Sequence, residues 1–178
     1  MILTIDIGNT TTVFGVFAHP GRAGEGGKLR SKFTIATQPN RAPAKRGNEI
    51  TRGIQKRGMK ISRMDEILIC SVVPVMTRIL AQALRRAGAR RVQVIGQDIE
   101  VPLVNRYTYP EQVGQDRLVG AYAAWTRFKK DCIVADFGTA ITIDLVTKKG
   151  HYLGGVIAPG LEISLEALAT RTALLPKV

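Results

Sequence analysis

The stretch TIDIGNTTTVFGVF (residues 4–17) decides the fold, because it places a polar, acidic turn between two apolar runs. The apolar residues at 2–7 and 12–17 predict two short buried strands. The turn between them contains the carboxylate of Asp6, the glycine Gly8 and a row of threonine hydroxyls. A buried hairpin does not need this chemistry at its tip, so the turn is a candidate functional site.

A second stretch repeats the pattern further along the chain. VADFGTAITIDLV (134–146) again places an aspartate, a glycine and a threonine, Asp136, Gly138 and Thr139, between two apolar runs. Because only two copies occur, the repetition indicates a duplicated domain rather than a solenoid. Strands that are mixed with helices indicate α/β layers.

The other elements follow from hydrophobic periodicity and from turn residues. The sequence predicts further strands at 28–37, 65–74, 90–96 and 151–160. It predicts helices at 48–60, 76–88, 114–128 and 161–176. Residues 38–47 are polar and carry two prolines, which favours a loop. The second repeat lacks the strand and helix elements that would complete it, so we expect a C-terminally truncated chain.

The composition is typical of a globular protein with a substantial core. The chain has 178 residues, 45% of them hydrophobic, and a mean hydropathy of +0.04. No apolar run reaches the roughly 18 residues of a membrane span, and the N-terminus lacks the residue order of a secretory signal. Cys70 and Cys132 lie in apolar runs and are expected to be reduced thiols. These features predict a cytoplasmic protein without a membrane partner.

The net charge of +12 allows a second class of function. Much of it falls within residues 22–63, and a basic surface can attract nucleic acid. Few aromatic residues interleave with these charges, so a stacking platform for single strands is poorly supported. A solvated basic face is the favoured interpretation. The cationic residues are Arg22, Lys28, Arg30, Lys32, Arg41, Lys45, Arg46, Arg52, Lys56, Arg57, Lys60 and Arg63.

The two acidic turns have the chemistry of a phosphate site. A glycine turn presents backbone N–H groups to an anion, and threonine hydroxyls donate hydrogen bonds to phosphate oxygens. A carboxylate would repel phosphate unless a cation such as Mg²⁺ lies between them. The alternative is that Asp6 and Asp136 only cap turns. Because the pattern occurs twice between buried strands, we expect the two turns to face each other across a nucleotide triphosphate.

A third candidate is the motif GQDR (114–117) at the start of a predicted helix. Asp116 can accept a proton, and the guanidinium of Arg117 can hold a substrate anion. An aspartate in a first turn is also ordinary helix capping. The neighbouring Gly114 and Arg117 favour a catalytic interpretation.

Taken in order, these motifs resemble the type III pantothenate kinase family, also called the CoaX or Bvg accessory factor family. The resemblance implies an α/β fold of the acetate and sugar kinase/Hsp70/actin type, a duplicated ribonuclease-H-like fold with mixed sheets flanked by helices. It divides the chain into domains at 1–114 and 115–178. The matching segments are DIGNTTT (6–12), SVVP (71–74), YPEQVGQDR (109–117), DFGTAITID (136–144), GGVIAPG (154–160) and ALATRTALLP (167–176).

The resemblance also implies an activity and its cofactors. Members of the family phosphorylate pantothenate with ATP to give 4'-phosphopantothenate, the first step of coenzyme A biosynthesis. They need Mg²⁺ and a monovalent cation, K⁺ or NH₄⁺, and they form homodimers. By resemblance, Asp116 is the general base, Asp6 reaches Mg²⁺ and Asp136 binds K⁺.

The remaining site residues are carried over in the same way. The residues implied to bind ATP are Asp6, Ile7, Gly8, Asn9, Thr10, Thr11, Thr12, Val13 and Thr139. The residues implied to bind pantothenate are Tyr107, Gly114, Gln115, Asp116, Arg117 and Thr172. Two alternatives stay open: a non-catalytic accessory or regulatory member of the family, and a basic nucleic-acid-binding protein. The intact residues of the three motifs favour the enzyme; they are Asp6, Asp116, Arg117, Asp136 and Thr139.

Overall fold

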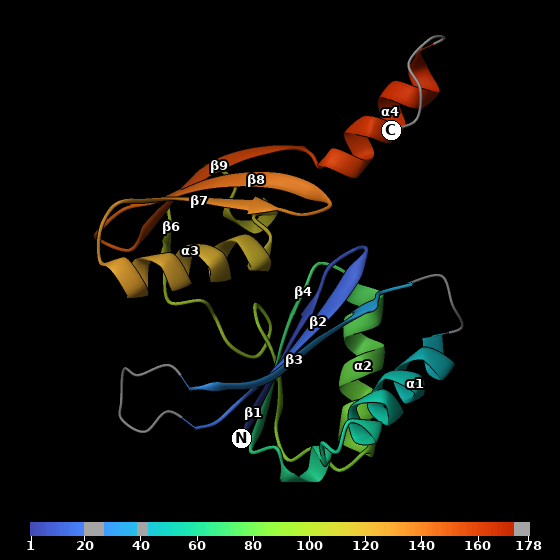
Figure 1. Ribbon diagram of the computed structural model, residues 1–178. Helices are drawn as coiled ribbons and strands as arrows, with labels where there is room; N and C mark the ends of the chain where they lie inside the picture. Colours follow the sequence, from blue (N-terminus) through green and yellow to red (C-terminus); the bar gives the residue numbers. More distant parts are fainter. Residues whose placement is uncertain (20–26, 39–42, 173–178) are drawn as a thin grey trace. The chain divides into compact units, whose positions relative to one another are not determined.

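The computed structural model describes residues 1–19, 27–38 and 43–172, and the chain divides into two compact units (Figure 1). Unit 1 is Met1–Glu100 and unit 2 is Val101–Val178. Each unit has its own sheet and its own cluster of buried apolar residues. No helix within the described ranges is long and apolar enough to cross a bilayer.

Unit 1 contains a five-stranded mixed sheet with the strand order β3-β2-β1-β4-β5. The first three strands form an antiparallel meander, and β4 and β5 extend the sheet in parallel on the other side of β1. The predicted hairpin at 4–17 is confirmed as the β1–β2 pair. The strands are β1 (Ile2–Ile7), β2 (Thr11–Phe17), β3 (Leu29–Ala36), β4 (Glu66–Ser71) and β5 (Val92–Val94).

Two helices pack on one face of this sheet. They are α1 (Pro43–Lys56) and α2 (Pro74–Arg86), and a short 3-10 helix (Ile61–Arg63) follows α1. Ile5 and Ile7 of β1 are buried in the same cluster as Ile54 of α1 and Leu80 of α2. Because side chains alternate along a strand, Asp6 lies on the opposite face of the sheet.

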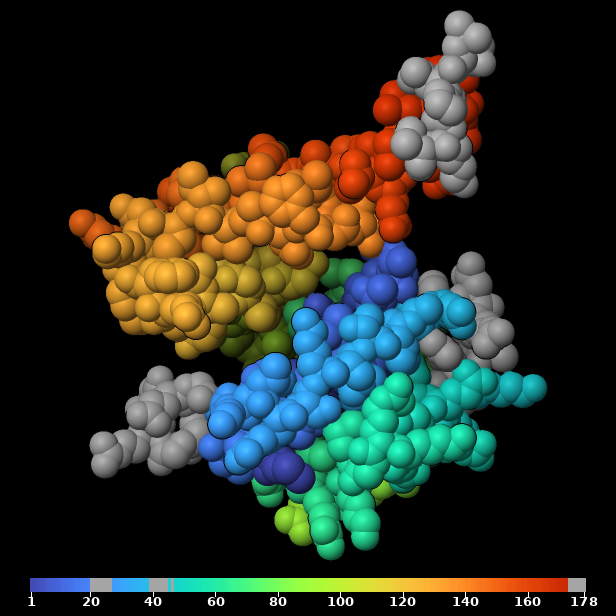
Figure 2. Space-filling view, in the orientation of Figure 1, coloured from blue at the N-terminus to red at the C-terminus, as the bar shows by residue number. Residues whose placement is uncertain are grey.

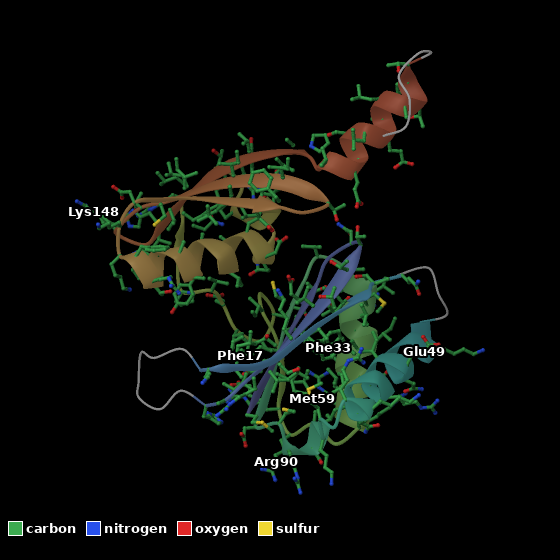
Figure 3. All side chains as sticks on the ribbon, in the orientation of Figure 1. Phe17, Phe33, Glu49, Met59, Arg90 and Lys148 are labelled. Atoms are coloured by element: carbon green, nitrogen blue, oxygen red, sulfur yellow. The ribbon has the colours of Figure 1, made fainter. Side chains whose placement is uncertain are left out.

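Aromatic side chains pack near the β3 edge of the sheet. Phe33 of β3 stacks on Phe14 of β2 with ring centroids 4.5 Å apart, and the guanidinium of Arg57 lies over the Phe33 ring at 4.5 Å. Figure 3 shows Phe33 beside the helical layer. Met59 also packs against the core cluster. One of the cations in the basic segment therefore covers the core.

The start of α1 differs from the prediction. The sequence pattern favoured a loop over 38–47 and a helix over 48–60, but the helix runs from Pro43 to Lys56. Proline is compatible with a first helical turn, because its missing N–H has no partner there and its φ angle is already helical. The helix ends before Gly58, whose φ of 76° is left-handed. Residues 39–42 of the predicted loop lie outside the described residues.

Unit 2 contains a four-stranded sheet with the order β6-β9-β8-β7. Its strands β7, β8 and β9 form an antiparallel meander, and β6 pairs in parallel with β9. The strands are β6 (Val104–Asn105), β7 (Cys132–Phe137), β8 (Ala140–Val146) and β9 (His151–Pro159). The helices are α3 (Gln115–Phe128) and α4 (Leu161–Arg171), with a short 3-10 helix at Pro110–Gln112.

Helix α3 covers one face of the unit 2 sheet. Leu118 and Ala121 of α3 pack against Val146 of β8 and Tyr152 of β9. On the opposite face Ile133, Phe137 and Ile143 are exposed, and Figure 2 shows the β7–β8 hairpin at the surface of the unit.

The segment 101–114 belongs to unit 2, whereas the sequence analysis placed it in the first predicted domain. Val101, Leu103 and Val113 pack into the unit 2 core, because β6 within this segment pairs with β9. The boundary between the two compact units therefore falls between Glu100 and Val101 in the chain. The assignment of two ribonuclease-H-like domains with a boundary at 114 stays a prediction.

Candidate functional site

The β1–β2 turn carries the first acidic motif. Asp6 is exposed near the end of β1, whereas Ile7 is buried in the core. The Gly8 N–H donates to the Thr11 carbonyl at 2.9 Å, which closes the turn. A Cβ at Gly8 would lie 3.1 Å from the Thr11 carbonyl oxygen, so glycine suits this tight approach.

Two buried threonines lie beneath this turn. Thr12 is 1% exposed and Thr37, the residue after β3, is 0% exposed. Their hydroxyl oxygens are 3.0 Å apart, and the Thr37 hydroxyl donates to the Gly8 carbonyl at 2.7 Å. The Thr12 hydroxyl is therefore directed into the protein, and it does not present a donor to solvent.

The residues predicted to bind ATP thus separate into two groups. Asn9, Thr10 and Thr11 are exposed at the turn and can face a ligand. Ile7 and Thr12 are buried, and Val13 is half-buried within β2, so their contribution would come from the backbone or through packing. Sequence reasoning missed Thr37, which appeared only as the end of a predicted strand.

The second acidic turn joins β7 to β8. Asp136 and Thr139 are exposed, and the Gly138 N–H donates to the Ala140 carbonyl at 3.0 Å. The Gly160 N–H, directly after β9, donates to the Thr139 carbonyl at 3.0 Å. The two aspartates occupy equivalent positions in their hairpins, because each belongs to the pair before the last one at the turn. Asp6 pairs with Val13 of β2, and Asp136 pairs with Thr142 of β8.

Gly160 allows a close backbone contact with this second turn. A Cβ there would lie 2.3 Å from the Gly138 carbonyl oxygen and 2.4 Å from that of Thr139. We expect G160A to displace the turn and to lower the free energy of unfolding by about 1–3 kcal/mol. Urea denaturation tests this, with G120A as the control, because a Cβ at Gly120 has only Val134 nearby at 3.9 Å. Equal stability of the two variants would contradict the expectation.

The predicted catalytic residue lies at the start of α3. Gly114 is the N-cap of this helix, Gln115 is its first residue and Asp116 is its second. The Asp116 carboxylate is exposed, and its Oδ1 accepts the N–H of Arg117 at 2.9 Å. An exposed carboxylate with a defined orientation has access to a substrate hydroxyl.

Arg117 makes a buried ion pair rather than facing solvent. Its Nε donates to both carboxylate oxygens of Asp144, at 3.0 and 3.2 Å, and its Nη2 donates to Oδ1 at 2.5 Å. The Tyr152 hydroxyl donates to the same Oδ1 at 2.6 Å. Asp144 is 3% exposed and Tyr152 is 0% exposed. This cluster of Arg117, Asp144 and Tyr152, the α3 cluster, fastens the start of α3 to β8 and β9.

The ion pair with Asp144 uses the Nε and Nη2 donors of the Arg117 guanidinium. Burial works to lower the pKa of Arg117, but the hydrogen bonds and charge of Asp144 outweigh this effect, so the pKa is raised above its usual value. Because Asp144 neutralises the cation, Arg117 offers a substrate anion little net charge. The role of Arg117 as an anion receptor stays a prediction, and the contacts observed give it a structural role.

Burial and Asp144 also raise the pKa of Tyr152 above the usual 10.0. A tyrosine in the unfolded chain loses its proton near pH 10.0, whereas Tyr152 in the folded protein keeps its proton to a higher pH. The stabilisation is fully present below pH 10.0 and is lost as the pH rises through the folded pKa. We expect the unfolding free energy to fall above pH 10.0 and Y152F to flatten this fall. Urea titrations at several alkaline pH values test this, and Y109F is the control because Tyr109 is exposed.

The other two residues predicted to bind pantothenate lie in different places. The Tyr107 ring packs against Gly154, where a Cβ would come within 2.6 Å of it, next to Tyr152. Thr172 follows α4 and its hydroxyl donates to the Leu168 carbonyl at 2.8 Å. Figure 1 shows α4 continuing from the end of β9 away from α3. Unit 2 therefore brings Tyr107 and Arg117 to one region and leaves Thr172 apart.

In unit 2, Asp144 and Tyr152 are the site residues that sequence reasoning missed. Asp144 is the last residue of the motif DFGTAITID (136–144), and the resemblance assigns it no role. A single acidic residue within the apolar run ITIDLV must be exposed or paired. That signal called for a cation, and Arg117 lies 27 positions earlier in the chain.

Two carboxylates suit the cations that the resemblance implies. Asp6 and Asp136 are exposed oxygen donors, each followed two residues later by a turn glycine. Mg²⁺ is held by one or two carboxylates together with phosphates and waters, so one carboxylate beside a phosphate turn fits this ion. Among the described residues, no three His, Cys, Asp or Glu side chains gather into a metal-binding group.

Comparison with known sequences identifies close relatives. A family model described as type III pantothenate kinase matches residues 2–178. Type III pantothenate kinase 2 of Symbiobacterium thermophilum is 38% identical over 100% of this chain and 65% of its own length. The type III pantothenate kinase of Rubrobacter xylanophilus is 39% identical over 100% and 65%, and that of Persephonella marina is 40% identical over 100% and 67%. The chain thus spans about two thirds of the length of these relatives.

Solved structures show the same fold at low sequence identity. The ethanolamine utilization protein EutJ from Carboxydothermus hydrogenoformans matches with a TM-score of 0.52 and 15% identity, over 95% of this chain and 55% of that one. A reductive activator for corrinoid, iron-sulfur protein matches with a TM-score of 0.50 and 16% identity, over 88% and 31%. These likenesses confirm the predicted fold class, an α/β fold of the acetate and sugar kinase/Hsp70/actin type with mixed sheets flanked by helices.

Proposed function

Because the chain belongs to the type III pantothenate kinase family, we propose that it phosphorylates pantothenate with ATP, the first step of coenzyme A biosynthesis. The products are 4'-phosphopantothenate and ADP. The observation that carries this proposal is the exposed carboxylate of Asp116, held on the first turn of α3 by the buried α3 cluster. This arrangement supports a base that waits in a fixed position for a substrate hydroxyl.

Asp116 acts as the general base in this proposal. It takes the proton of the primary hydroxyl of pantothenate while that oxygen bonds to the γ-phosphorus of ATP and the bond to the bridging oxygen breaks. A base needs to lie within hydrogen-bond reach of the proton that it removes. Tyr107, Gly114, Gln115, Arg117 and Thr172 are the residues proposed to surround pantothenate. Positioning and charge neutralisation account for most of the rate in such transfers.

The turn at 6–13 is proposed to bind the phosphates of ATP, and Thr139 contributes a hydroxyl. Asp6 is proposed to hold Mg²⁺ and Asp136 a monovalent cation, K⁺ or NH₄⁺. When bound, Mg²⁺ neutralises charge on the phosphate oxygens. The glycine turn and the exposed hydroxyls of Thr10 and Thr11 support this assignment.

We further propose that the protein acts in the cytoplasm as a homodimer, with pantothenate and ATP as its ligands. The family membership supports both statements. Nucleic acid is the less favoured partner, since at least one cation of the basic segment, Arg57, packs on Phe33.

A coupled assay of ADP release tests the proposed function. We expect turnover that requires pantothenate and that is faster in K⁺ than in Na⁺. ADP release that is independent of pantothenate would contradict the proposal. No release, together with retained Mg·ATP binding, would favour the accessory or regulatory alternative. Salt-dependent DNA binding without turnover would favour the nucleic-acid-binding alternative.

A further inference from the structure

In both units the residue that follows the third strand of the antiparallel meander, β3 or β9, is hydrogen-bonded to the acidic turn. In unit 1 the Thr37 N–H donates to the Thr10 carbonyl at 2.8 Å. In unit 2 the Gly160 N–H donates to the Thr139 carbonyl at 3.0 Å. The two bonds occupy the same place in the repeated meander. The residue types differ, because unit 2 uses the bare backbone of glycine and unit 1 adds a hydroxyl.

The hydroxyl of Thr37 forms a directed chain of hydrogen bonds. Its single proton is donated to the Gly8 carbonyl, 2.7 Å away. A hydroxyl has one donor and two acceptor positions, so in the 3.0 Å contact with Thr12 the Thr12 hydroxyl must donate and Thr37 must accept. The order Thr12 to Thr37 to Gly8 is thereby determined. All of it lies beneath the turn, because both threonines are buried.

This chain determines the orientation of two peptide units in the turn. In a planar trans peptide the C=O of one residue and the N–H of the next point in opposite directions, and the described residues contain no cis peptide bond. When Thr37 holds the Gly8 carbonyl inward, the Asn9 N–H is directed away from Thr37. Its N–H holds the Thr10 carbonyl, which directs the Thr11 N–H away in the same manner. The directions of two peptide N–H groups in the turn are thereby fixed, and the N–H groups of a turn are the donors that bind an anion.

We propose that Thr37 is a positioning residue for the phosphate-binding turn at 6–13, acting through the peptide groups that it orients. The ligand part of this inference rests on the proposed function, because it takes the anion to be the phosphates of ATP. Thr37 itself does not touch the ligand, since it is buried beneath the turn.

The test compares the T37V and T37S variants of the full 178-residue chain. Valine keeps the shape of the side chain and removes the hydroxyl, which leaves the Gly8 carbonyl and the Thr12 donor without this partner. Serine keeps the hydroxyl. T77V is the matched control, because Thr77 is 4% exposed and its hydroxyl donates to a backbone carbonyl, that of Val73, at 3.1 Å.

Two measurements are made on each variant: calorimetric affinity for Mg·ATP, and amide hydrogen exchange at residues 8 and 37, whose N–H groups donate to the Thr11 and Thr10 carbonyls at the turn. We expect T37V to bind Mg·ATP about tenfold more weakly and to exchange the turn amides faster. T37S and T77V should stay within about twofold of the unsubstituted chain. Protection of the β1 and β4 amides shows in each case that unit 1 remains folded.

Unchanged affinity and unchanged exchange in T37V would overturn the proposal. It is also overturned if T37S loses as much affinity as T37V, because the effect would then come from packing. If the unsubstituted chain fails to bind Mg·ATP, the proposed function fails at that point. The exchange comparison then decides the positioning role alone: faster exchange in T37V supports it, and equal exchange refutes it.

Discussion

Replacing Asp116 by asparagine is expected to lower pantothenate turnover by about 10²–10⁴-fold, the usual contribution of a general base. Asparagine has the same shape and can still accept the Arg117 N–H, but it cannot take the proton of the substrate hydroxyl. Mg·ATP affinity should remain largely intact, because Asp116 is not among the residues proposed to bind ATP and the substitution changes only the group that takes the proton. The assay is pantothenate-dependent ADP release, combined with calorimetric titration of Mg·ATP.

The matched control for D116N is E162Q. Glu162 is also an exposed acid in the first turn of a helix, that of α4. The E162Q substitution removes one negative charge from a comparable helix position, and Glu162 is not among the proposed site residues. Turnover in D116N within about twofold of the E162Q value would refute the assignment of the base.

Replacing Asp144 by alanine is expected to cost about 3–5 kcal/mol of unfolding free energy in unit 2. The Arg117 side chain, only 13% exposed, would keep its charge without a counter-charge. The Tyr152 hydroxyl would lose its acceptor at the same time. Because α3 begins at this cluster, its first turn should loosen and turnover should fall together with stability.

The control for D144A is E66A. Glu66 pairs with Arg91 at 3.5 Å, and the Arg91 side chain is 63% exposed. Loss of an exposed pair costs at most about 1 kcal/mol. Urea denaturation of both variants measures the difference, and a D144A effect as small as that of E66A would contradict the structural role of the α3 cluster.

Local patterns in the sequence were sufficient for most of the fold. The hairpins at both acidic turns follow from apolar runs separated by an aspartate and a glycine, and α2 follows from its helical spacing. The start of α1 was missed, because two prolines suggest a loop and only the structure shows Pro43 at a first helical position. A proline can either end or begin a helix, and local composition does not distinguish these cases.

The candidate site was predictable only where its residues are adjacent in the sequence. Asp116 and Arg117 belong to one motif, as do Asp6 and Gly8. The pairing of Arg117 with Asp144 and the bond from Thr37 to Gly8 join residues 27 and 29 positions apart. Such contacts depend on how strands are arranged in a sheet, which a linear pattern does not specify.

The aromatic residues of the chain are unevenly divided. The single tryptophan, Trp125, lies in unit 2, where its indole N–H donates to the Lys148 carbonyl at 2.9 Å and the Lys129 ammonium lies 3.9 Å from the ring centre. The four tyrosines, Tyr107, Tyr109, Tyr122 and Tyr152, lie in unit 2 as well. Intrinsic ultraviolet fluorescence therefore reports on unit 2 alone. Its emission will follow the melting of D144A or G160A, whereas changes in the T37V turn will be optically silent and will need resonance or exchange methods.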